Sequence, residues 1–120
     1  DKGDNYILRS KTNWKYNDEG KIIEKLFSEY EYKKVNKTKK TLTSTKKDVY
    51  EYKIKDVMPD YYYYENDVLR MKTIYSNEDS YVTTFYFDGG FVVDSVYENA
   101  THTKDIFYSN GNIIRQKVYE

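Results

Sequence analysis

The sequence predicts an all-β protein, an antiparallel array of β-hairpins that forms one domain over residues 1–120. First, a phrase of aromatic, turn and aliphatic residues recurs along the chain. Second, an aliphatic–aromatic pair follows each turn, and its last three copies, Ile74-Tyr75, Val96-Tyr97 and Val118-Tyr119, are 22 residues apart. A repeat of that length holds two short strands and two turns. Third, β-branched and aromatic residues fill the periodic stretches, whereas the chain has a single alanine.

Each copy of the phrase is centred on a predicted turn. In chain order these turns are Asn17-Asp18-Glu19-Gly20, Asn66-Asp67, Asp88-Gly89-Gly90 and Asn110-Gly111. Asn110-Gly111 is the strongest signal, because both central residues of a type I′ turn need positive φ. In the register that this turn predicts, Tyr108 faces Ile113. One pair further from the turn, Phe107 is expected to face Ile114.

The stretch between the first two copies contains no turn phrase. The segment Lys33–Lys47 holds seven lysines and no acid. Alternating patterns on both sides of it predict strands, so we expect the segment to be a long, exposed hairpin tip. Pro59 precedes Tyr61–Tyr64 and is expected to mark the start of a strand or an edge strand. In all we expect about eight to ten strands in an extended, twisted sheet that curls over its more apolar face. The alternative is a closed barrel, which would leave no edge strands.

Composition limits the classes of partner and chemistry. The 20 basic and 20 acidic residues give a net charge of +0, so no overall field attracts nucleic acid. The absence of cysteine excludes disulfides, thiolate catalysis and Cys-ligated zinc. The sequence contains no run of about 18 apolar residues, so no membrane span is predicted. Sixteen tyrosines, five phenylalanines and one tryptophan supply buried area in a chain that is only 38% hydrophobic, which predicts folding rather than disorder.

The spacing near 22 and the core Tyr108-Ser109-Asn110-Gly111-Asn112-Ile113 resemble bacterial MORN-variant and YD-type hairpin repeats. Phe87-Asp88-Gly89-Gly90 and Tyr16-Asn17-Asp18-Glu19-Gly20 look like weaker copies of this core. The resemblance implies an antiparallel β array on an exported bacterial protein, whether periplasmic, at the cell surface or secreted. It implies no shared catalytic residues. The first residue is Asp1 and not Met, which is expected for a removed signal sequence or a cloning boundary.

No spacing of residues predicts a catalytic group, a cofactor or a metal site. His102, the only histidine, lies in a segment that is predicted to be a turn, and we interpret it as a surface residue. The acid clusters at Asp18-Glu19, Glu65-Asn66-Asp67 and Asn77-Glu78-Asp79 are interpreted as turn formers. They lack the spacing of a calcium-binding loop. The lysine-rich segment is interpreted as a solvated loop rather than a site for phosphate, heparin-like glycans, anionic lipid or nucleic acid.

Aromatic side chains are the candidates for partner binding, because large contiguous apolar patches mark interaction sites. Alternation along the strand at the Asn66-Asp67 turn divides them between two faces. One face carries Tyr62, Tyr64, Leu69 and Met71, and the other carries Tyr61 and Tyr63, where we expect Trp14 to join them.

These observations predict a non-enzymatic β-repeat binding or structural module of an exported or surface-associated bacterial protein. Its expected partner is a protein, a glycan or a second copy of the chain, and no cofactor is expected. The alternatives are a glycan-binding module and a small hydrolase that uses carboxylates such as Asp88 or Asp94. A glycosidase needs two carboxylates roughly 5–10 Å apart in a cleft. A repeat sheet with short loops offers little room for one.

Overall fold

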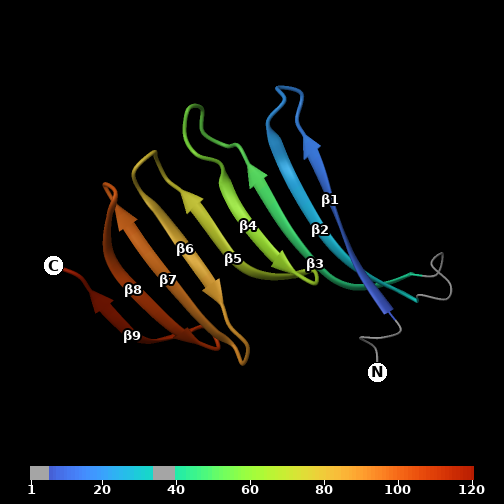
Figure 1. Ribbon diagram of the computed structural model, residues 1–120. Coiled ribbons are helices and arrows are strands. Elements are labelled where there is room, and N and C mark those ends of the chain that lie inside the picture. Colours follow the sequence, from blue (N-terminus) through green and yellow to red (C-terminus); the bar gives the residue numbers. More distant parts are fainter. Residues whose placement is uncertain (1–5, 34–39) are drawn as a thin grey trace. The chain divides into compact units, whose positions relative to one another are not determined.

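The computed structural model describes residues 6–33 and 40–120, and all regular structure in these residues is β. Nine antiparallel strands lie in the sheet in the order in which they occur in the chain (Figure 1). The strands are β1 (Tyr6–Tyr16), β2 (Ile22–Lys33), β3 (Lys40–Glu51), β4 (Asp60–Glu65), β5 (Val68–Tyr75), β6 (Tyr81–Tyr86), β7 (Phe91–Glu98), β8 (Thr101–Ser109) and β9 (Asn112–Val118). The predicted hairpin array is confirmed. Because the strand order is linear, the sheet is open and the barrel alternative is wrong.

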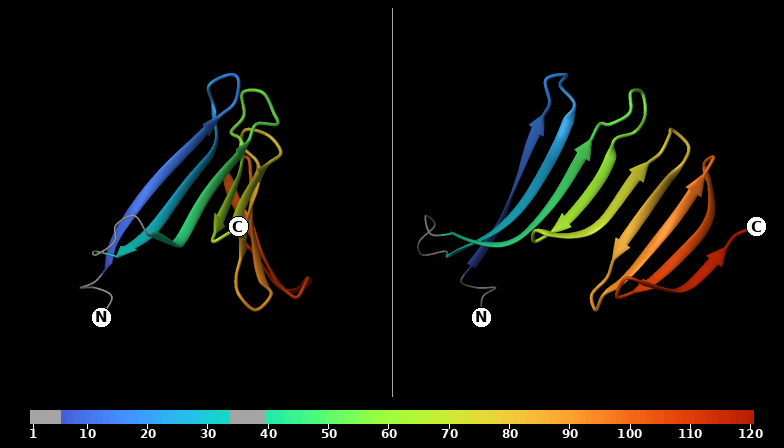
Figure 2. Two further views of the ribbon diagram at one scale, coloured as in Figure 1. Left: turned by 90° about the vertical axis from the view of Figure 1, so that its right-hand side faces the viewer. Right: turned by 180° about the vertical axis from the view of Figure 1, so that it is seen from behind.

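The chain divides into two compact units, each of which is described by itself. The first unit comprises Asp1–Asp48 and Tyr64–Val68, and it contains β1, β2, most of β3 and the β4–β5 turn. The second unit comprises Val49–Tyr63 and Leu69–Glu120, and it contains most of β4 and β5 together with β6 to β9. Within the second unit, β5 to β9 can be followed from two further directions in Figure 2.

In the first unit, β1 and β2 pair along their whole length, with a bulge between Lys15 and Tyr16. The turn that joins them is held by Asn17, whose Oδ1 accepts hydrogen bonds of 3.0 Å from the backbone N–H groups of Glu19 and Lys21. A short polar side chain that bonds its own turn in this way explains why acids and amides gather there. The predicted turn is therefore confirmed.

The lysine-rich segment Lys33–Lys47 is not one long hairpin tip, and this prediction was wrong. β3 begins at Lys40, so the second half of the segment is strand, whereas residues 34–39 lie outside the described residues. The threonines and the leucine between these lysines favour extended backbone. The Oγ of Ser44 also donates a hydrogen bond of 2.9 Å to Oε1 of Glu29 on β2, which ties β3 to its neighbour.

A loop of residues 52–59 joins β3 to β4, and Pro59 directly precedes the strand, as predicted. The first residue of β4, Asp60, is buried at 2% exposure. Its Oδ2 is in contact with Nζ of Lys53 in the loop, and its Oδ1 accepts the N–H of Tyr75 at 2.9 Å. Charge-assisted hydrogen bonds of this kind offset the cost of burying the carboxylate, so Asp60 fastens the loop to β5.

Three hairpin turns of the second unit have positive φ, two of them at the predicted places. Asn110-Gly111 has φ values of 50° and 85°, as a type I′ turn requires. Gly89-Gly90 has φ values of 81° and 80°. The β7–β8 turn, Asn99-Ala100, also has positive φ, at 51° and 63°, although alanine carries a Cβ atom that disfavours this region.

A bulge changes the predicted register of the last hairpin. Tyr108 lies opposite Ile113, as predicted, but Phe107 lies opposite Arg115 instead of Ile114. Ile114 is the extra residue, so every later side chain of β9 points to the face opposite the predicted one. The prediction was wrong because the turn fixes only the first pairs, and nothing in the residue pattern reveals the insertion.

The described residues contain no buried apolar core. Among residues 7–32 and 40–120, for which burial is described, the only buried side chains are Ser28, Asp60 and Thr84, and all three are polar. Apolar side chains therefore lie on the two faces of the sheet, where neighbours across the strands cover part of each one. None of the described residues forms a helix long and apolar enough to cross a membrane.

Candidate functional site

On one face of the second unit, cross-strand pairing arranges the side chains in three rows that run across the strands. The ring ladder consists of Tyr75, Tyr81, Tyr97, His102 and Tyr119. The polar row consists of Thr73, Thr83, Ser95, Asp105 and Lys117. The apolar row consists of Met71, Phe85, Val93 and Phe107, with Arg115 at its β9 end.

The 22-residue repeat builds these rows. Residues that are 22 positions apart in the sequence therefore lie two strands apart in the sheet and in the same row. Tyr75, Tyr97 and Tyr119 are equivalent in this sense, and so are Met71 and Val93. The period therefore determines which side chains share a row, in addition to where the turns fall.

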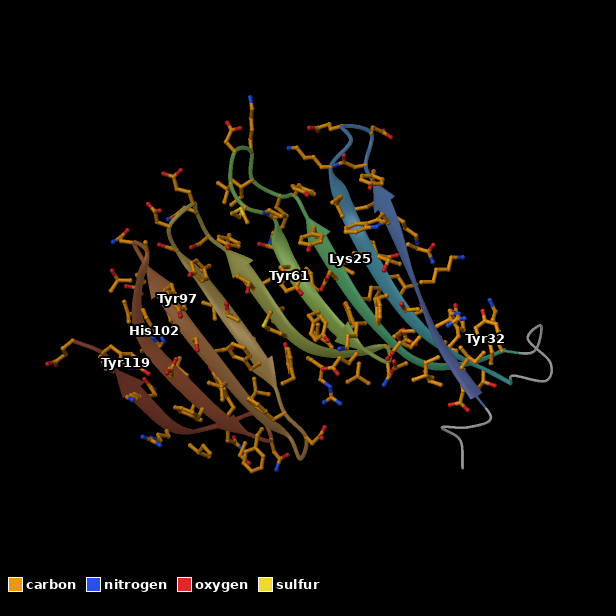
Figure 3. The ribbon with its side chains drawn as sticks, in the orientation of Figure 1. Lys25, Tyr32, Tyr61, Tyr97, His102 and Tyr119 are labelled. Carbon is orange, nitrogen blue, oxygen red and sulfur yellow. The ribbon has the colours of Figure 1, made fainter. Side chains whose placement is uncertain are left out.

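The ring ladder extends from β5 to the residue that follows β9. Successive ring centroids are 5.0 Å apart for Tyr75–Tyr81, 4.6 Å for Tyr81–Tyr97, 4.7 Å for Tyr97–His102 and 4.3 Å for His102–Tyr119. The planes of the two middle pairs differ by only 12° and 18°, so the ring faces cover one another. Figure 3 shows the last three members of the ladder on neighbouring strands. Each stacked pair is worth about 0.5–1.5 kcal/mol beyond its buried area.

A bulge in β8 places His102 in the ladder. Tyr97 lies opposite His102, whereas Val96 lies opposite Lys104, which leaves Thr103 as the extra residue. Strict 22-residue spacing from the β6 member would put Thr103 in this position. The prediction that His102 belongs to a turn was wrong, because the turn has only two residues and β8 begins immediately after it.

Asp105 is the centre of a hydrogen-bond network beside the ladder. Its Oδ1 lies 2.7 Å from Nε2 of His102, and its Oδ2 accepts the hydroxyl of Tyr119 at 2.5 Å. Burial raises the pKa of Asp105, but hydrogen bonds from Tyr119, Ser95 and His102 outweigh burial and hold the pKa below its usual range. The hydrogen bond to this carboxylate raises the pKa of Tyr119.

The opposite face carries a second network around Asp94. Its Oδ1 accepts the hydroxyl of Thr84 at 2.5 Å. Burial, followed by the charge of Asp94 and a hydrogen bond to it, raises the pKa of Tyr108. Asp88 lies in the β6–β7 turn at 92% exposure and is bonded to Nη1 of Arg70 at 2.9 Å. The two carboxylates of the hydrolase alternative thus have separate partners.

Several predicted partner-binding residues lie beside the apolar row. Met71 is the β5 member of that row, opposite Phe85. Leu69 lies two residues earlier and so points to the same side of β5. Tyr62 on β4 is half-buried, and burial is the main cause of its raised pKa.

The other tyrosines of β4 in the second unit are Tyr61 and Tyr63, which alternate with Tyr62 along the strand. The ring of Tyr61 lies 5.4 Å from that of Tyr50 on β3, with the planes tilted by 37°. Figure 3 labels Tyr61 on β4. This ring contact ties β4 to β3 within the unit.

The remaining predicted residues, Trp14 and Tyr64, belong to the first unit. Trp14 is 46% exposed, and Nζ of Lys25 lies 5.0 Å from its ring centroid. Nζ of Lys47 lies 4.9 Å from the ring of Tyr64. These are cation–π contacts in which a lysine shields one ring face. The grouping of Trp14 with Tyr61 and Tyr63, which belong to the other unit, stays a prediction.

Sequence reasoning did not identify the ring ladder as a site. The equal spacing of Tyr75, Tyr97 and Tyr119 was the available signal, and it was used only to place strands. Within the described residues, no group of three or more His, Cys, Asp or Glu side chains could hold a metal ion. Comparisons with family models, curated proteins and solved structures give no match for this chain. Its function must therefore be argued from the site.

Proposed function

We propose that this chain is a non-enzymatic β-repeat binding or structural module of an exported or surface-associated bacterial protein. Its uncovered surface supports the proposal. Among residues 7–32 and 40–120 no apolar side chain is buried, so both faces of the sheet leave apolar side chains partly uncovered. Contiguous apolar patches that stay uncovered mark interaction sites.

The apolar row is the part of this surface best suited to a partner. This row overlaps the partner-binding residues predicted from the sequence, because Met71 belongs to both groups and Leu69 points to the same side of β5. The phenylalanines of the row, Phe85 and Phe107, lie at its centre and at its β8 end. Aromatic residues and methionine are enriched at the centres of protein interfaces.

A protein partner is favoured over a glycan on this face. Sugar rings bind to free faces of aromatic rings. In the ring ladder the faces of Tyr81, Tyr97 and His102 are covered by their neighbours in the stack. The ladder therefore presents ring edges and hydroxyl groups to the partner, and its main role in this proposal is to hold the strands of the apolar row in place.

Ligand selection tests the proposal. A displayed peptide library and a glycan array are screened against the folded chain, and substrate libraries of glycosides and peptides are tested for turnover. We expect a saturable peptide ligand whose binding is lost in Met71→Gln. The matched control Met71→Leu, which keeps the apolar volume, retains it.

Thermal melts of both variants separate loss of binding from loss of fold. Failure to select any saturable ligand contradicts the proposal. So does hydrolysis of a library member that disappears in Asp94→Asn or Asp88→Asn.

A further inference from the structure

We propose that the edge strand β9 binds an extended acidic segment of a partner protein, which adds to the sheet as a further antiparallel strand. The inference rests on the proposed function, since it names the class of partner that the binding module takes. It uses the outer edge of the sheet, where Arg115 ends the apolar row, whereas Met71 lies at the other end of that row on β5, so a variant at each end tests the two proposals apart.

On its outer side, the backbone of β9 pairs with no strand of the described sheet. Within the described sheet β8 is its only neighbour, and every residue of β9 is exposed. The N–H of Tyr119 donates to the carbonyl of Thr103 on β8 at 2.9 Å. Because N–H groups alternate in direction along an antiparallel strand, those of Gln116 and Val118 point away from β8. An edge of this kind is the template for strand addition.

The side chains of β9 on the ladder face are basic. Arg115 lies 5.4 Å from the ring centroid of Phe107, and Nζ of Lys117 lies 5.0 Å from that of Tyr119. Among the described ion pairs, none involves Arg115 or Lys117. Asp105 is opposite Lys117, but its oxygens accept other hydrogen bonds. Carboxylates at two alternate positions of an added strand would supply the missing counter-charge.

The other face of β9 carries two exposed apolar side chains. Ile113 is 55% exposed and Val118 is 66% exposed, with Gln116 between them on the same side. An added strand therefore gains contacts on both faces if it alternates acidic and apolar residues. This alternation would select the partner, because the backbone hydrogen bonds to an added strand do not distinguish one sequence from another.

Charge disfavours a second copy of this chain as the occupant. An antiparallel β9–β9 pair centred on Gln116 places Arg115 opposite Lys117. The other edge strand, β1, carries three basic residues and no acid, so a β9–β1 pair between copies also sets basic against basic. Like charges directly opposite each other destabilise a sheet.

The side-chain part of the inference is tested by fluorescence anisotropy with a short labelled peptide that alternates glutamate and valine. A peptide that alternates lysine and valine is the control. We expect only the acidic peptide to bind, and less tightly as salt is added. Binding should weaken about tenfold or more in Arg115→Gln/Lys117→Gln and persist in Arg115→Lys/Lys117→Arg.

The backbone part is tested with Gln116→Pro, which removes an outward N–H and leaves the inward bonds to β8 intact. We expect this variant to lose the acidic peptide and Gln116→Ala to keep it. In the wild-type chain, hydrogen exchange at the amides of Gln116 and Val118 should slow when the peptide is added.

Equal binding to the proline variant overturns the inference, and so does the loss of binding in Arg9→Gln/Lys11→Gln on β1 instead. No binding of the acidic peptide by the wild-type chain also overturns it. If a ligand sensitive to Met71→Gln is found in that case, the proposed function stands and only the edge-strand inference fails.

Discussion

The two units form antiparallel sheet by different means. In the first unit, β1 and β2 have 11 and 12 residues and pair along their whole length, and single cation–π contacts such as Lys25 over Trp14 cover them. In the second unit, β5 to β9 have six to nine residues, and a continuous ring ladder crosses them. The stability of the first unit depends on long runs of backbone hydrogen bonds between paired strands. That of the second unit depends on the side-chain rows that its repeat creates.

The comparison predicts where a single side chain matters most. Tyr97 is stacked on both sides, so Tyr97→Ala removes two ring contacts together with a half-buried side chain. We expect the free energy of unfolding to fall by about 2–3 kcal/mol. Trp14→Ala in the first unit, where the ring is 46% exposed, should cost about 1 kcal/mol or less. Urea denaturation followed by circular dichroism measures both values, and equal costs would contradict the comparison.

A smaller effect is expected at the turns of the second unit. Gly111 has a φ of 85°, and a Cβ atom added there would meet no other atom within 4 Å, so Gly111→Ala introduces backbone strain without a clash. We expect a loss of about 1–2 kcal/mol. Ala100 is a residue with a Cβ atom that already has a positive φ, of 63°. Ala100→Gly should therefore relieve backbone strain and stabilise the chain by about 0.5–1 kcal/mol. Thermal melts test both signs, and a loss of stability in Ala100→Gly would refute the turn argument.

Alkaline pH should weaken the second unit first. A hydrogen bond to Asp105 raises the pKa of Tyr119, burial raises those of Tyr75 and Tyr108, and a hydrogen bond to Asp60 raises that of Lys53. Because these folded-state pKa values lie above the unfolded ones, the stability they confer is complete below about pH 10. It is lost as the pH rises through the folded values.

The two units carry separate reporters for this titration. Trp14, the only tryptophan, reports on the first unit by its fluorescence, whereas far-UV circular dichroism also includes the second unit. We expect the loss of the dichroism signal to precede any change at Trp14. A fluorescence change that comes first would contradict the prediction.

A still smaller effect is expected at acid pH. The pKa of Asp105 is held below its usual range, so its contribution is present above the unfolded value of about 3.9 and is lost as the pH falls through the folded value. In Asp105→Asn, that part of the acid dependence should disappear. Parallel acid titrations of the wild-type and variant chains, followed by circular dichroism, measure the difference, and superimposable curves would count against the network around Asp105.

The predictable part of the fold follows the repeat. The turn at Asn110-Gly111 and the pair Tyr108–Ile113 were derived from local residue types and agree with the structure. The bulge at Ile114 was not predictable, because Ile113 and Ile114 are both apolar and neither face of the strand is purely polar. Register is weakly specified under those conditions, so a one-residue insertion leaves no trace in the pattern.

The candidate site was predictable to the same extent. Tyr75, Tyr97 and Tyr119 lie in one row because they are 22 residues apart. His102 breaks that spacing by one residue, since the bulge at Thr103 separates it from the strict repeat. In the first unit, the start of β3 was missed because the prediction followed the charge of Lys40 and Lys46-Lys47, although the run Thr41–Thr45 between them favours a strand.

Nuclear Overhauser effects between aromatic ring protons test the central claim, that repeat and bulge together build the ring ladder, most directly. The account predicts contacts of the His102 ring with the rings of both Tyr97 and Tyr119, together with a side-chain contact between Phe107 and Arg115. A strictly periodic register would instead bring the side chain of Thr103 against Tyr97 and leave the His102 ring without aromatic neighbours. That result would contradict the account.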